Sequence, residues 1–152
     1  MDKTFSCNQH ELAQAKITFW FYVVSIPIIV FLLFILPILR GIAYSFSVFQ
    51  LFYVALILIL LFLTYRSYRV MHAIQISRCT ISDDTITGVS TPDPFKKTEN
   101  FSIKRSDVLG VAKKQVNISM TRYFNAVVLN THDKQYVLFA IDRADELIEE
   151  LQ

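Results

Sequence analysis

Residues of the types that carry chemistry are few in this chain and stand far apart. The three histidines, His10, His72 and His132, lie alone in different segments, so we interpret each as a surface or interfacial residue. Cys7 and Cys79 have no neighbours typical of a metal site or a redox pair. A chain with three glycines also lacks a glycine-rich phosphate loop, and no Ser/His/Asp motif is present. We therefore predict a protein that is not an enzyme, with no cofactor, no metal and no small-molecule substrate.

Basic side chains are the better candidates for binding. The net charge of +2 is too small to indicate nucleic acid as a partner. If several basic residues share the face toward a bilayer, each contributes about 1 kcal/mol to the attraction for anionic lipid. The alternative is that they are strand-edge residues, whose charge discourages edge-to-edge pairing. The candidate contacts to lipid or to a partner are Arg66, Arg69, Lys96, Lys97, Lys113, Lys114 and Arg122.

Two uncharged apolar runs, 17–39 and 43–65, must position these residues. A helix needs roughly 20 apolar residues to cross a hydrocarbon core of about 30 Å. Lipid offers the backbone no hydrogen-bond partners, so each run has to be a helix. The first run is too long for a signal peptide, and the second follows it at once. We predict a transmembrane α-helical hairpin in five parts: an N-terminal segment 1–16, a span 17–39, an external turn 40–42, a span 43–65 and a soluble domain 66–152.

Five residues of the hairpin are candidates for contact between helices. Pro27 interrupts the first span, where it kinks the helix or frees a carbonyl that Ser25 or a neighbouring helix satisfies. Gln50 is the one strongly polar side chain of the second span, and it bonds either to a partner helix or to interfacial water. Gly41 and Ser45 form a small-xxx-small pair, which permits close helix approach.

Basic residues near the spans predict the orientation. The turn carries Arg40 alone. The flanks carry more positive charge, at Lys3, Lys16, Arg66, Arg69 and Arg78. By the positive-inside rule, this asymmetry places both termini in the cytoplasm and the turn outside.

The stretch after the spans predicts a β domain. From residue 71 the apolar residues alternate, first at Ile74 and Ile76. The alternation then changes phase, which indicates a β-bulge near Ser77–Arg78. Two prolines exclude a central strand at 90–94 and predict a loop there. Further strands are predicted at 85–89, 100–104, 109–120, 123–130 and 135–140.

The last residues predict a short amphipathic helix, 143–152, with Asp142 as its N-cap. A helix of about ten residues is marginal alone, so its apolar face must pack on the sheet. The apolar face consists of Ala144, Leu147, Ile148 and Leu151, and the face toward water carries Glu146, Glu149 and Glu150.

Three stretches carry a family resemblance: Ile-Ser-Asp-Asp-Thr-Ile-Thr at 81–87, Phe-Ser-Ile-Lys-Arg-Ser-Asp-Val-Leu-Gly-Val at 101–111, and the strand and helix of 136–151. Their order resembles that of bacterial pleckstrin-homology-like (PH-like) domains found behind a two-helix membrane anchor. The resemblance implies that the soluble domain has an α+β fold, an antiparallel β-barrel of six to seven strands closed by a C-terminal helix. It also implies that the whole protein is anchored in the bacterial inner membrane. The first hairpin loop, Asp83-Asp84, is acidic, which argues against recognition of inositol phosphates.

Three functions are consistent with this organisation. The first is a non-enzymatic scaffold anchored in the lipid bilayer that presents its soluble domain to a protein partner or to a second copy as a homo-oligomer. The second is an accessory or immunity-type subunit of a larger membrane complex, which the spans contact. The third is a sensor of anionic lipid that uses the basic residues above.

Overall fold

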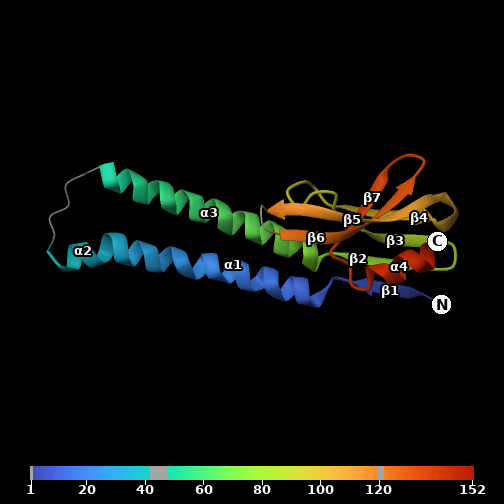
Figure 1. Cartoon of the computed structure of the whole chain (residues 1–152), viewed down its shortest axis with the longest axis horizontal. Coiled ribbons are helices and arrows are strands. Elements are labelled where there is room, and N and C mark those ends of the chain that lie inside the picture. Colours follow the sequence, from blue (N-terminus) through green and yellow to red (C-terminus); the bar gives the residue numbers. More distant parts are fainter. Residues whose placement is uncertain (1, 42–47, 120–121) are drawn as a thin grey trace. The chain divides into compact units, whose positions relative to one another are not determined.

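The structure, a computed structural model, describes residues 2–41, 48–119 and 122–152. The chain divides into two compact units (Figure 1). The helical unit is Ala15–Tyr68, and the sheet unit joins the N-terminal residues up to Gln14 to Arg69–Gln152. The first residues of the chain therefore belong to the same unit as the last ones.

Both uncharged runs are helical where the structure describes them. Helix α1 (Gln9–Val30) continues through a π-helical turn (Phe31–Ile35) into α2 (Leu36–Leu39). Helix α3 (Val48–Gln75) forms the return. By length and composition, Gln9–Leu39 and Leu51–Gln75 are able to cross a membrane. The most apolar stretch of each has no buried residues, and the mean hydropathies are 2.8 and 1.9.

The helix α3 runs further than the sequence predicts. The predicted strand from residue 71 and its bulge at Ser77–Arg78 are wrong, because α3 continues to Gln75. The buried residues at this end are Val70, Ala73, Ile74 and Ser77, which is the spacing of one helix face. The hydroxyl of Ser77 donates to the carbonyl of Ala73 at 2.9 Å and closes the last turn.

The two prolines of the first helical run lie in different surroundings, and Ser25 does not satisfy the carbonyl that Pro27 frees. The hydroxyl of Ser25 donates to the carbonyl of Phe21 at 2.7 Å, whereas the carbonyl that Pro27 leaves without an amide partner is that of Val23. Just before Pro37 the helix widens, and the Leu36 amide bonds to the carbonyl of Phe31. A π-helical turn therefore ends two residues before Pro37, which has no amide hydrogen to donate.

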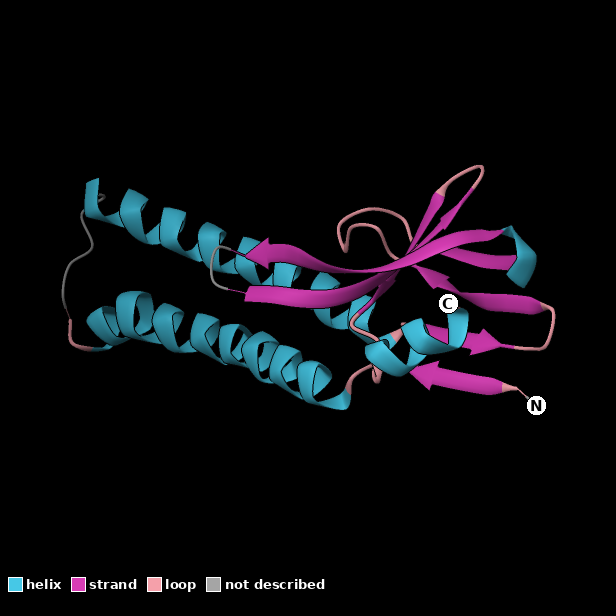
Figure 2. Cartoon of the chain, turned by 45° about the vertical axis from the view of Figure 1, so that its right-hand side comes forward, coloured by secondary structure: helices cyan, strands magenta, loops and turns pink. Residues whose placement is uncertain are grey.

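The sheet unit holds two antiparallel sheets and a final helix, shown with magenta strands in Figure 2. The four-stranded sheet has the order β1 (Lys3–Ser6), β2 (Arg78–Ile81), β3 (Thr85–Ser90) and β4 (Glu99–Lys104). After a 3₁₀ turn (Arg105–Asp107), the three-stranded sheet has the order β5 (Val108–Ser119), β6 (Arg122–Thr131) and β7 (Gln135–Phe139). The helix α4 (Ala144–Leu151) follows. The predicted antiparallel domain with a final helix is confirmed, but the two sheets do not close into the predicted barrel.

The strand β1 precedes the helices yet pairs with β2, which follows them. Phe5 lies opposite Cys79 and Ser6 lies opposite Arg78. The whole helical unit is thus an insertion between two paired neighbouring strands. No strand was predicted in 1–16, although the alternation Lys3-Thr4-Phe5-Ser6-Cys7 has the period of a strand and buries Phe5 and Cys7.

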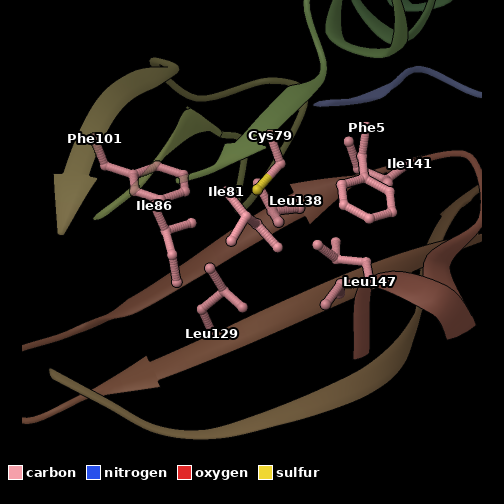
Figure 3. Close-up of a cluster of buried hydrophobic side chains, with 10 residues drawn as sticks. Phe5, Cys79, Ile81, Ile86, Phe101, Leu129, Leu138, Ile141 and Leu147 are labelled. Carbon is pink, nitrogen blue, oxygen red and sulfur yellow. The ribbon is translucent and has the colours of Figure 1, made fainter. Parts of the chain in front are cut away.

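The core of the sheet unit draws on both ends of the chain. Phe5 of β1 packs in one cluster with Leu138 of β7 and Leu147 of α4, each at most 1% exposed. Figure 3 shows the side chains of this cluster pointing toward one another. The other buried members are Cys79, Ile81, Ile86, Phe101, Val127, Leu129 and Ile141.

The start of α4 differs from the prediction, although its apolar face is confirmed. Asp142 is not the N-cap, because its amide donates to the carbonyl of Ser6 at 2.9 Å and continues the pairing with β1. Arg143 is the residue before the helix, with a left-handed φ of 51° and no side-chain cap. Leu147 is buried, and the other predicted apolar residues pack against the core. Glu150 does not simply face water, because it forms an ion pair with Lys3 of β1.

We expect Gly88→Ala to lower the free energy of unfolding by about 1–3 kcal/mol, as overpacking does in a filled core. A Cβ at Gly88 would lie 2.8 Å from the carbonyl oxygen of Arg78 and 3.0 Å from the ring of Phe101. The matched control is Gly110→Ala, where a Cβ would meet nothing within 4 Å. Thermal unfolding of the detergent-solubilised chain measures both, and equal midpoints for the two variants would contradict the packing at Gly88.

Candidate functional site

A loop of residues 91–98, which we call the Arg69 loop, is fixed to the end of α3. The guanidinium of Arg69 donates from Nε to the carbonyl of Pro94 at 3.2 Å and from Nη2 to that of Lys96 at 3.0 Å. Two of the predicted basic residues, Arg69 and Lys96, are therefore brought together. The contact was not foreseen, since it joins a side chain to backbone atoms 25 and 27 residues away.

The Arg69 loop has a defined conformation. The Asp93 carboxylate accepts the amide of Phe95 at 2.9 Å, and the Lys96 amide donates to the Asp93 carbonyl at 3.0 Å. Both bonds close a turn at 93–96. Within the loop, Thr91 and Pro94 are buried, while Phe95, Lys96 and Lys97 are exposed. The prediction of a loop at the two prolines is confirmed from residue 91 onward.

Two more of the predicted basic residues, Lys113 and Lys114, lie on β5. Lys113 of β5 forms an ion pair with Asp145 of α4 at 2.8 Å, and Lys114 beside it is exposed. Arg66 belongs to the helical unit. The side chain of Arg122 lies outside the residues whose side chains the structure describes.

The helical unit is held by aromatic contacts that the sequence did not indicate. Phe19 lies 6.0 Å from Tyr68 and Phe34 lies 6.4 Å from Tyr53, measured between ring centroids. An early residue meets a late one in both pairs, so the two helices run antiparallel.

The predicted helix contacts remain predictions. Ser25 and Pro27 lie within α1. Gly41 has a left-handed φ of 68° just after the first helical run, which suits a residue without a Cβ. Ser45 and the side chain of Gln50 lie outside the described residues.

A cavity of about 540 Å³ opens in the sheet unit where α3 ends and β1 meets β2. Its lining includes the side chains of His72, Arg78 and Asn100, which are able to hydrogen-bond an anionic or polar molecule. Cys7 also lines it, and its thiol accepts a long 3.7 Å contact from the side-chain Nε2 of Gln9. Among the residues that the structure describes, no group of three His, Cys, Asp or Glu side chains is placed to hold a metal ion.

Ion pairs on the surface of the sheet unit shift the pKa values of two of its ionisable groups. A hydrogen bond from Lys3 lowers the pKa of Glu150, and one to Glu99 at 2.6 Å raises the pKa of Lys134. Both pairs link elements distant in sequence, β1 to α4 and β4 to the loop before β7. The exception is Cys79, because burial raises the pKa of its thiol from 9.0 to about 12.

The edges of the two sheets are not equivalent. β1 is extended by a bridge between Cys7 and Ile141, and β7 receives a 2.7 Å hydrogen bond from the Thr91 amide to the Val137 carbonyl. By contrast, the described ladders pair β4 with β3 alone and β5 with β6 alone. Among the described residues, the outer edges of β4 and β5 carry no second strand.

Comparison of the chain with protein-family models, with curated proteins and with solved structures finds no match. Its own features define its class. Two helices are long and apolar enough to span a membrane, and they are joined to a small domain of antiparallel sheets with a final helix.

We expect the thiol of Cys79 to resist alkylation in the folded chain. With a pKa raised from 9.0 to about 12, the folded protein at pH 9 holds on the order of a thousandfold less thiolate than an ordinary cysteine. A Cys7→Ser variant isolates this thiol, and mass spectrometry after iodoacetamide treatment measures it with and without denaturant. As the pH rises, the thiol ionises in the unfolded chain before it does so in the folded chain. The contribution of the buried thiol to the free energy of unfolding is therefore fully present below pH 9 and is lost as the pH rises toward 12. Equal alkylation rates in folded and unfolded chains would contradict the burial.

Proposed function

We propose that this protein is a membrane-anchored, non-enzymatic interaction protein. Its PH-like sheet domain presents the open edge of β5 to a protein partner or to a second copy of the chain. The observation that carries the proposal is the pairing of β5 with β6 alone, over most of a strand of 12 residues.

An open strand edge offers a row of unpaired amide and carbonyl groups to an added strand. This is the basis of peptide recognition by β-augmentation, in which the main chain gives affinity and alternate side chains give specificity. β7, on the far side of β6, has only five residues and pairs with Ala126–Asn130. Ala112 and Gln115 of β5 are exposed, so an incoming strand has access to this edge.

The proposed anchor rests on the composition and the exposure of the helices. Large apolar side chains such as Phe21, Phe52 and Phe62 are more than half exposed along α1 and α3. A face of this kind needs lipid or another apolar partner. β1 precedes the helical insertion, β2 follows it, and the two strands pair with each other. Both ends of the insertion therefore lie on the same side of the bilayer. The basic flanks then favour the cytoplasm, and the resemblance favours a bacterial inner membrane.

The order of the strands supports a PH-like domain. The resemblance implies six to seven antiparallel strands and a C-terminal helix, and the described residues form four antiparallel strands, then three, then a helix. In this proposal the membrane hairpin is an insertion between the first and second strands of that domain.

A photoreactive side chain in place of Gln115 on β5 tests the proposal in membranes of living cells. We expect a crosslinked adduct, of twice the chain mass for self-association or of another mass for a partner. The matched control is Gln135, another exposed strand glutamine, on β7. No adduct at Gln115, or the same adducts at both positions, would contradict binding at this edge.

A further inference from the structure

We infer that the Arg69 loop is an interfacial anchor that lies on the anionic headgroups of the bilayer that α3 crosses. This inference rests on the proposed membrane anchoring of the helices. It adds a surface and a ligand: Phe95 for the boundary of the acyl chains, and Lys96 and Lys97 for lipid phosphates.

The first step is the depth of Arg69. The second uncharged run ends at Tyr65, and Arg69 follows one turn later in the same helix, about 6 Å along the axis. The headgroup layer on each side of a bilayer is about 5–7 Å thick, the difference between a core of about 30 Å and a total of about 40–45 Å. Arg69 therefore lies outside the hydrocarbon core, at the level of the headgroups.

The second step is the connection from Arg69 to the loop. Its guanidinium does not merely add charge, because it binds the carbonyls of Pro94 and Lys96 at 3.2 and 3.0 Å. The loop is consequently held at the depth of Arg69. In this arrangement Arg69 is a positioning residue, and the lysines of the loop supply the charge toward lipid.

The third step is the composition of the exposed tip. Phe95 is 39% exposed, and Lys96 and Lys97 follow it into solvent. Exposed phenylalanine rings are suited to the boundary between headgroups and acyl chains, and lysines near the surface are attracted to anionic lipid. The one acidic residue of the loop, Asp93, uses a carboxylate oxygen to accept the amide of Phe95. The turn therefore directs an aromatic ring and two cations outward.

The other lysine pair of the sheet unit supplies the contrast. Lys113 and Lys114 lie on β5, where Lys113 is already paired with Asp145. Neither lysine belongs to the loop that Arg69 binds. The same two charges on β5 are thus a matched control for position.

Depth-dependent quenching of tryptophan in proteoliposomes tests the inference on the full chain. The chain has one tryptophan, Trp20, 59% exposed in α1. In a Trp20→Phe background, we place a tryptophan at Phe95 and, as control, at Leu109, which is also exposed, on β5. With lipids brominated near the top of the acyl chains, we expect Phe95→Trp to be quenched as strongly as native Trp20 and Leu109→Trp to remain unquenched.

The charges are tested in the same Phe95→Trp chain. We replace vesicles of phosphatidylcholine by vesicles of phosphatidylcholine and phosphatidylglycerol in equal amounts. Quenching of the tryptophan at position 95 should then increase in the parent and in the Lys113→Gln/Lys114→Gln variant. The increase should be lost in Lys96→Gln/Lys97→Gln and should fade at high salt. All variants must retain the circular dichroism spectrum of the parent.

Each contrary result has a separate meaning. Quenching of Trp20 together with an unquenched Phe95→Trp would overturn the interfacial loop and leave the membrane anchor standing. If neither Trp20 nor Phe95→Trp were quenched, the membrane anchor itself would be overturned. Quenching of Phe95→Trp that is indifferent to phosphatidylglycerol and to the lysines would overturn recognition of anionic headgroups.

Discussion

The pairing of β1 with β2 is the interaction on which the rest of the structure depends. It joins Lys3–Ser6 to Arg78–Ile81 across the whole helical insertion. The pairing brings Phe5 into the core beside Cys79, and it continues through Cys7 and Ser6 to the residues that follow β7. Without β1, the four-stranded sheet loses an edge and α4 loses its ion pair to Lys3. Both ends of the chain are thus required to complete one small domain.

This constraint also distributes the surfaces of the sheet unit. The edges of β1 and β7 are used for contacts between the sheets, whereas β4 and β5 have a strand on one side only among the described residues. The Arg69 loop forms a separate surface, whose backbone is hydrogen-bonded to Arg69 of α3. In the functions proposed above, one surface binds another protein chain and the other binds lipid. In this account the two do not compete, because they are built on different strands.

The sequence was sufficient for the elements with a strong local pattern. The uncharged runs, the turn at Asp83-Asp84, the strands from residue 85 onward and the apolar face of α4 follow from periodicity and turn residues. It failed where two patterns overlap or where a partner is distant. Ile74 and Ile76 imitate a strand at the end of a helix, and Asp142 has the residue type of an N-cap but its backbone pairs with Ser6. The contact of Arg69 with its loop has no local signal, since carbonyl oxygens are present at every residue.

A disulfide between strands tests the pairing of β1 with β2 most directly. Thr4 and Thr80 lie opposite each other, with their hydroxyl oxygens 3.3 Å apart. Thr87 lies opposite Thr80 on the next strand, so it is about 10 Å from Thr4, beyond the reach of a disulfide. In oxidised membranes the account predicts an intramolecular disulfide in Thr4→Cys/Thr80→Cys and none in Thr4→Cys/Thr87→Cys, as read by mass spectrometry of the linked peptides. Failure of the first pair to crosslink, or equal crosslinking of both pairs, would contradict it.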